Sequence, residues 1–196
     1  MSSKAKDRAF RNEALGRALD KAVVTPSLET RRTLFDLLCR ASGLPGVNPN
    51  MGLVAAFAEE CAHRGPPGEA LAMKLVALTA DEAPGDDERE ILPMCGVAAV
   101  GALAIAHHER RKEFVAILHD RAEDFRYRVR DLIPGLLADI GASAGDAFLV
   151  ELDGWMDGYF HAEAVLLALD DTKIASRIND ETVLASVIVR EFFLQR

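Results

Sequence analysis

Cysteine and histidine are the side chains of this sequence best suited to nucleophilic chemistry or metal binding, and both are few. Three cysteines cannot form a closed set of disulfides, and Cys39, Cys61 and Cys95 show no Cys-x-x-Cys spacing. We interpret them as small buried apolar side chains. Glu60-x-x-His63 matches half of a di-iron carboxylate motif, but the sequence holds no second copy, and such a site needs two.

Four other histidines are candidate metal ligands. His107 and His108 precede Glu109, His119 follows in the next predicted helix, and His161 lies in a later segment. Stacked helices could bring two of these side chains together around a metal ion, but nothing in their spacing requires it. The sequence therefore predicts no metal site, and whether His107, His108, His119 or His161 binds a metal stays open at this point.

Gly141-x-Ser143-x-Gly145 matches the Gly-x-Ser-x-Gly pattern of a serine nucleophile. That motif requires a turn between a strand and a helix, which exposes the serine at the edge of a sheet. Here the segment lies between two predicted helices, so we interpret it as a helix end with a capping glycine. We predict no catalytic residues and no cofactor.

The elements that must position these residues are all predicted to be helices. Apolar residues recur at three- and four-residue spacing, and no segment alternates as a strand does. Ser27 and Thr30 are suited to cap the second helix, and Pro93 is expected to kink or shorten the fifth. The 196 residues thus form a single all-helical domain of about five antiparallel helix pairs. The helices are expected at about residues 5–22, 27–42, 50–63, 67–81, 86–107, 109–122, 125–140, 145–157, 159–170 and 180–195.

Short sequences recur at a spacing close to one helix pair. Arg89-Glu-Ile-Leu-Pro93 returns in the next predicted pair as Arg130-Asp-Leu-Ile-Pro134. Such recurrence is typical of repeat architectures, in which each helix pair needs neighbours to bury its apolar face.

One stretch resembles the HEAT-repeat pattern. Asp124-Phe-Arg-Tyr-Arg-Val-Arg130 is followed by an apolar helix ending in Ile140-Gly141, and in HEAT repeats an Asp precedes a Val-Arg pair by five residues. Asp157 repeats the register later in the chain, although Ala and Glu there replace Val-Arg. The resemblance is best over about residues 109–170. It implies an armadillo-type α-solenoid of stacked helix pairs, with a compact helical bundle as the alternative.

Charge is distributed unevenly along the chain. The net charge of −8 argues against a general nucleic-acid binder. Residues 131–172 contain nine Asp or Glu and no Lys or Arg, whereas residues 109–130 contain seven Lys or Arg. In a solenoid this acidic block should map to one zone of the surface.

For Trp155, core packing is the alternative to a role at that surface. The candidate binding residues are Asp146, Glu151, Asp153, Trp155, Asp157, Tyr159 and Glu163.

These features predict a non-enzymatic interaction or scaffold module that binds a protein partner with a basic surface. The alternative is a nucleic-acid-processing enzyme, because HEAT-like proteins include alkylated-base DNA glycosylases as well as bilin lyases. The basic residues of segment 110–130 would then have to contact DNA, although the HEAT pattern uses arginines at positions 128 and 130 to bridge neighbouring repeats. The apolar segment 183–194 is a candidate homodimer patch.

No membrane association is expected. The N-terminus has no apolar signal region, and the longest apolar run, residues 91–106, is shorter than a membrane span of about 20 residues. Three unpaired cysteines suit a reducing compartment, so we expect a cytoplasmic protein.

Overall fold

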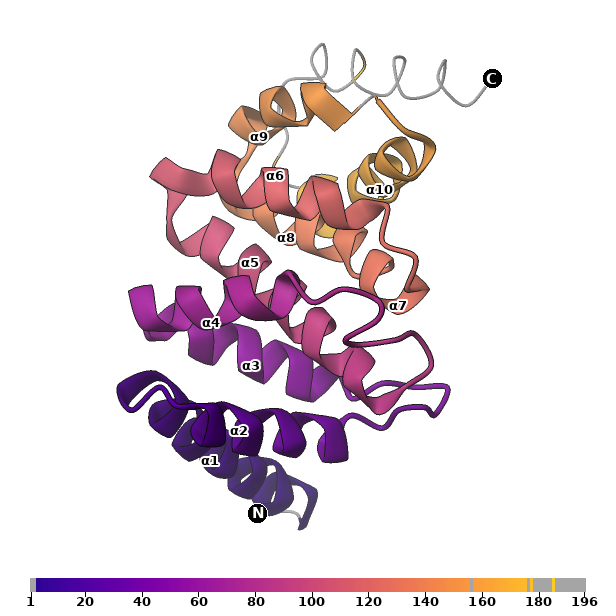
Figure 1. Cartoon of the computed structure of the whole chain (residues 1–196). Coiled ribbons are helices and arrows are strands. Elements are labelled where there is room, and N and C mark those ends of the chain that lie inside the picture. The colour runs from indigo at the N-terminus through magenta and orange to yellow at the C-terminus, as the bar shows by residue number, and fades with distance from the viewer. Residues whose placement is uncertain (1–2, 156, 176, 178–184, 186–196) are drawn as a thin grey trace. The chain divides into compact units, whose positions relative to one another are not determined.

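A computed structural model describes residues 3–155, 157–175, 177 and 185, without the side chains of residues 3–12, 153 and 175. Every regular element in this part of the chain is a helix (Figure 1), which confirms the all-helical prediction. The sequence predicts one domain, and the contacts of the chain divide it into two compact units, residues 1–99 and 100–196. Each unit is described by itself.

The first unit contains α1 (Ser3–Val24), α2 (Leu28–Ala41), α3 (Met51–His63) and α4 (Pro66–Val76). Helix α1 packs on α2, α3 packs on α4, and α1 also contacts both α3 and α4. The predicted cap of α2 is confirmed: Thr30 donates its backbone N–H to Ser27 Oγ, and Ser27 N–H donates back to Thr30 Oγ1. Core side chains of these four helices that are at most 1% exposed include Leu15, Leu19, Leu34, Leu38, Phe57, Cys61 and Leu75.

A single arginine ties α1 to the end of α3. Arg64 donates from Nη2 to Asp20 Oδ1 at 2.8 Å and to the carbonyl oxygen of Gly16 at 3.3 Å, and it pairs with Glu60 one turn earlier. The Glu60-x-x-His63 segment therefore has a structural role, because Glu60 is held by Arg64 while His63 is exposed at the helix end.

Among the helices that the structure describes, α5 (Ile91–Ala106) is the most apolar, and it follows the short 3-10 helix η1 (Glu88–Glu90). Pro93 lies in the first turn of α5, where a missing N–H costs no hydrogen bond; the helix therefore begins near Pro93 and no kink is needed. Among the described residues, only Glu88–Ala106 is long and apolar enough to cross a membrane. Within it, 78% of the apolar 18-residue stretch is buried. Such burial is typical of a core helix.

The second unit contains most of the predicted site. Its elements are the end of α5, η2 (His108–Arg110), α6 (Arg111–Ala122), α7 (Tyr127–Arg130), α8 (Ile133–Ala144), α9 (Asp146–Glu151), η3 (Leu152–Trp155), α10 (Tyr159–Leu169) and α11 (Thr172–Ala175). Helix α10 packs on α8 and α6, and α11 packs on α8 and α10.

Two predicted helices of this unit are broken in the structure. The helix expected over 125–140 is divided into α7 and α8, with Pro134 in the first turn of α8. A proline there fits a helix start, because its missing N–H would have no partner in the first turn. The helix expected over 145–157 ends as α9 at Glu151 and continues as η3. The helix and dimer patch predicted beyond residue 180 lie outside the described residues, apart from residue 185.

The Gly-x-Ser-x-Gly segment is a helix end, as predicted. Gly141 and Ser143 lie within α8, and Gly145 follows it with φ of 64°. A Cβ on Gly141 would lie 2.2 Å from Ile174 Cδ1, so this glycine allows α11 to pack against α8. Ser143 is exposed on the helix surface, and the segment has no strand before it.

Candidate functional site

A buried ion pair organises the loop between α6 and α7. Arg126 donates to both carboxylate oxygens of Asp124, from Nε at 2.7 Å and from Nη2 at 2.6 Å, and the two side chains are only 3% and 5% exposed. Burial opposes the charge of Asp124, but the hydrogen bonds and charge of Arg126 outweigh it and lower the pKa of Asp124 below its ordinary value. The Asp that carries the HEAT resemblance is thus a structural residue.

Most of the basic residues between 110 and 130 are held by neighbouring groups. Arg111 donates from Nε and Nη2 to Glu151 on α9, at 3.1 and 2.8 Å, and both side chains are largely buried. Arg126 and Arg128 are themselves buried. The others form further contacts within the unit: Arg110 with Glu113, Arg121 with Asp124, and Arg130 with the Asp124 carbonyl and the Phe160 ring. Few of these basic side chains are therefore available to contact the phosphate backbone of a nucleic acid.

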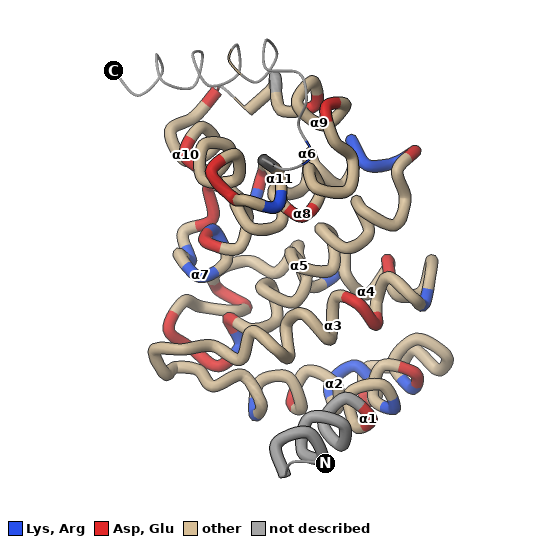
Figure 2. The backbone as a smooth tube through the Cα atoms, turned by 180° about the vertical axis from the view of Figure 1, so that it is seen from behind, with Lys and Arg blue, Asp and Glu red and all other residues tan. Residues whose placement is uncertain are grey.

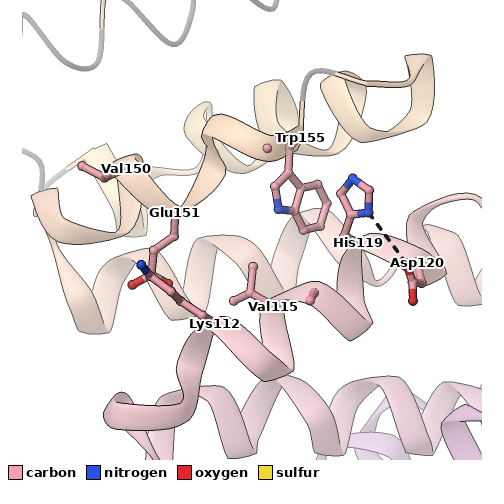
Figure 3. A pocket seen from close by; sticks show the side chains of 9 residues that line it. Lys112, Val115, His119, Asp120, Val150, Glu151 and Trp155 are labelled. Carbon is pink, nitrogen blue, oxygen red and sulfur yellow. Dashed lines mark ion pairs between the residues drawn. The ribbon is translucent and has the colours of Figure 1, made fainter.

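A cavity of about 400 Å³ opens between α6 and the α9–η3 segment (Figure 3). Trp155 points from η3 toward His119 on α6, and their rings meet edge to face at 5.1 Å between centroids. The cavity volume falls within the range of small-molecule pockets. The residues that line it are Lys112, Val115, Ala116, His119, Asp120, Val150, Glu151, Gly154 and Trp155.

Behind Trp155, two imidazole rings are stacked on each other. The rings of His119 and His161 lie 3.7 Å apart between centroids and 17° from parallel. Asp157 Oδ1 lies 3.0 Å from His119 Nε2 and 2.7 Å from His161 Nδ1. Although partial burial opposes its charge, the hydrogen bond from His119 and the proximity of both rings lower the pKa of Asp157. These three residues form the one described group of His, Cys, Asp or Glu with metal-ligand spacing.

The outward face of α10 carries exposed apolar side chains. Tyr159 is 62% exposed and Leu167 is 55% exposed, with Glu163 between them at four-residue spacing. Phe160 adds a partly exposed ring, which stacks edge to face with Tyr159 at 5.5 Å. The helix contains no Lys or Arg, and acidic residues lie at both of its ends (Figure 2).

The seven predicted binding residues have different environments. Trp155 is 2% exposed, so it is a core residue that borders the cavity and cannot serve as an exposed anchor. Glu151 is paired with Arg111, Asp157 belongs to the histidine cluster, and Asp146 begins α9 half-buried. The side chain of Asp153 lies outside the described residues. Only Tyr159 and Glu163 share the outward face of α10.

The sequence left open whether His119 and His161 meet, because nothing in their spacing requires it. The missed signal was their separation of 42 residues along the chain. This is close to the spacing at which the Arg89–Pro93 sequence recurs at Arg130–Pro134. Residues one repeat apart tend to lie on adjacent helices of a stacked array. The Arg111–Glu151 pair, separated by 40 residues, follows the same spacing.

Comparison with known proteins assigns no family to the chain. No family model matches it, and no curated protein or solved structure matches it either.

Proposed function

We propose that this chain is a non-enzymatic HEAT-like interaction module that binds a basic, amphipathic segment of a partner protein through the outward face of α10. This face is defined by Tyr159, Phe160, Glu163 and Leu167. The observation that carries the proposal is the exposure of Tyr159 and Leu167 on either side of a carboxylate, on a helix without cations.

The composition of this face suits protein recognition. Exposed aromatic side chains are enriched among residues that dominate binding energy at protein interfaces. Burying these side chains on binding loses little conformational entropy, because Tyr and Phe have few rotatable bonds. Arg130, whose guanidinium lies 4.3 Å from the centre of the Phe160 ring, holds that ring at the edge of the face.

The charge around α10 defines the complementary partner. Glu163 lies in the middle of the face, and Asp170 follows the helix as an exposed residue. The acidic block of residues 131–172 surrounds it in sequence and contains no Lys or Arg. A partner segment with apolar side chains flanked by Lys or Arg would bury Tyr159 and Leu167 and place its cations beside these carboxylates.

The HEAT-like arrangement is part of the same proposal. Support comes from the pairing of α1 with α2 and of α3 with α4, and from the packing of α10 on α8, which are the first helices of two successive expected pairs. The buried Asp124–Arg126 pair and the contact of Arg130 with α10 are further support, since the HEAT pattern places an Asp and bridging arginines at corresponding positions.

A titration with designed peptides tests the binding face. The probe is a helical peptide with Leu on one face and Lys on the other, and its counterpart has Glu in place of Lys. We expect calorimetry to detect binding of the Lys peptide alone, weakening as salt rises because exposed charge pairs are screened. Tyr159→Ala and Leu167→Ala should each lower the affinity about tenfold, the loss expected for truncating a contact worth about 1.4 kcal/mol.

Leu28→Ala is the matched control, because Leu28 is also an exposed leucine (84%), on α2 of the first unit. It should leave the affinity unchanged. Equal binding of the Lys and Glu peptides, or equal loss in the Leu28 and Leu167 variants, would contradict the proposal. Binding of duplex DNA in place of either peptide would favour the nucleic-acid-processing alternative, which the pairing of the arginines between 110 and 130 disfavours.

A further inference from the structure

Three side chains from separate parts of the second unit meet at one carboxylate oxygen. His119 comes from α6, Asp157 from the turn after η3, and His161 from the first turn of α10. Their candidate ligand atoms all lie within 4.8 Å of one another. The proposed docking face does not include any of the three, so this site stands independently of it.

The hydrogen bonds of His161 determine which of its ring atoms faces Asp157. His161 Nε2 lies 3.0 Å from the backbone carbonyl oxygen of His119, and a carbonyl can only accept, so Nε2 carries the proton and donates. A neutral ring then has its lone pair on Nδ1. That Nδ1 atom is buried without a hydrogen-bond partner in a residue only 4% exposed, and it lies 2.7 Å from Asp157 Oδ1.

Two acceptor atoms this close repel each other unless a positive charge binds both. His119 Nε2 approaches the same carboxylate oxygen at 3.0 Å. Metal-binding histidines commonly donate their second ring N–H to a backbone carbonyl or a carboxylate, which fixes the ring orientation. His161 already has that arrangement through the carbonyl of His119.

A further candidate ligand lies next to His161. A Cβ built on Gly158 would lie 2.8 Å from His161 Nδ1 and 2.9 Å from Glu123 Oε1. Glu123 Oε1 and His161 Nδ1 therefore both lie close to Gly158, where an added side chain would crowd them. The exposed Glu123 carboxylate can turn toward the cluster, as can Asp157, whose side chain is 58% exposed.

We propose that His119, Asp157 and His161 bind a divalent transition-metal ion, with Zn²⁺ the best-fitting ion and Glu123 or water as the fourth ligand. Two imidazole nitrogens and one or two carboxylate oxygens are a common zinc ligand set. Both stacked rings bring a nitrogen to the same oxygen of Asp157. Binding therefore requires His119 Nε2 to give up the proton that it donates to Asp157, the rings to open slightly and Asp157 to turn. Trp155 covers the cluster and limits access of water from that side.

The test is a Zn²⁺ titration of the full chain without a polyhistidine tag, followed by calorimetry. We expect one ion per chain, and with Co²⁺ we expect the visible absorption bands of a tetrahedral site. Asp157→Asn and His119→Gln should weaken binding roughly tenfold or more. His108→Gln is the matched control, since His108 has an 85% exposed side chain outside the cluster, and it should bind as the wild type does.

Gly158→Ala tests the geometry without removing a ligand. Gly158 has φ of −153°, which alanine adopts readily, but the added Cβ would crowd His161 Nδ1. This variant should keep its circular dichroism spectrum and melting temperature while losing metal affinity. The proposal fails if the wild type shows no Co²⁺ bands, as expected if Asp157 and the histidines share only a proton. It also fails if the Asp157 and His108 variants bind Zn²⁺ equally well.

Discussion

The Asp124 carboxylate keeps its charge in the interior because Arg126 donates to both of its oxygens, and the Arg126 backbone N–H donates as well, at 3.0 Å. Asp124→Asn would remove that charge and with it the ion pair between Asp124 and the buried Arg126. We expect a loss of about 3 kcal/mol in the free energy of unfolding, since breaking a buried pair from one side is strongly destabilising. Urea unfolding at neutral pH measures it, and Asp131→Asn, at an exposed position, serves as the control.

The Asp124–Arg126 pair also determines how the stability of the protein should change with pH. The pKa of Asp124 is lower in the folded protein than the ordinary value of 3.8. Its contribution to stability is therefore fully present above the unfolded-state pKa and is lost as the pH falls through the folded-state pKa. The difference between wild type and Asp124→Asn should be constant above about pH 5 and narrow at lower pH. A constant difference down to about pH 3 would contradict this assignment.

At the residue scale, sequence reasoning succeeds where a role depends on near neighbours in the chain. The Ser27–Thr30 cap lies within a single helical turn, and it is present as predicted. The three cysteines are buried, as interpreted. In contrast, the stacking of His119 on His161 depends on how α6 and α10 pack, and the sequence near either histidine does not contain that information.

At the scale of helices, close packing of α5 on α4 depends on one glycine. A Cβ on Gly96 would lie 2.3 Å from the backbone nitrogen of Val76 and 2.7 Å from the Leu75 carbonyl carbon. Backbone atoms cannot move aside as a flexible side chain can, so Gly96→Ala should force the helices apart. We expect it to destabilise the protein by about 2 to 3 kcal/mol in thermal unfolding, the upper range for overpacking.

Gly135→Ala is the matched control for this prediction. Gly135 also lies in a helix, α8, but a Cβ there would meet no atom within 4 Å. Alanine should therefore stabilise the protein by about 0.5 to 1 kcal/mol through helix propensity alone. If both variants shift the melting temperature in the same direction, α5 and α4 are not packed as described.

Most helices begin and end near the residues that the sequence predicts, because Gly, Pro and capping residues mark their ends. The differences are at Pro93, at Pro134, at the end of α4 and at the end of α9. Prolines were assigned to helix interiors by the apolar pattern, whereas each lies in a first turn. Helix α4 ends at Val76 instead of about residue 81, where Thr79 and Glu82 form a separate turn through the Glu82 carboxylate. The spacing of apolar residues does not distinguish such a turn from the last turn of a helix.

At the scale of the molecule, the division between the two units falls inside α5, between Ala99 and Val100. A continuous helix crosses this division, so loss of structure in one unit should reach the other through α5. The three cysteines all belong to the first unit and report on it. Burial raises the pKa of Cys39 to about 11 and that of Cys61 to about 12, so the folded protein should react with a thiol reagent very slowly.

This coupling can be measured with a substitution confined to the second unit. Leu137 on α8 is fully buried, and Leu137→Ala should cost about 3 kcal/mol. If α5 couples the units, labelling of the cysteines in the first unit should accelerate more than tenfold, because reaction requires opening of the structure. Unchanged labelling rates in a variant with a lowered melting temperature would show that the second unit opens by itself.

The edge-to-face packing of Trp155 on both imidazoles has an optical consequence. Trp155 is the sole tryptophan of the chain, and its ring centroid lies 5.1 Å from that of His119 and 5.9 Å from that of His161. A protonated imidazole quenches indole emission at contact distance, whereas a neutral one does so far less. The intrinsic fluorescence of the protein is therefore an unlabelled, single-site reporter of what these two rings hold, whether a proton or an ion.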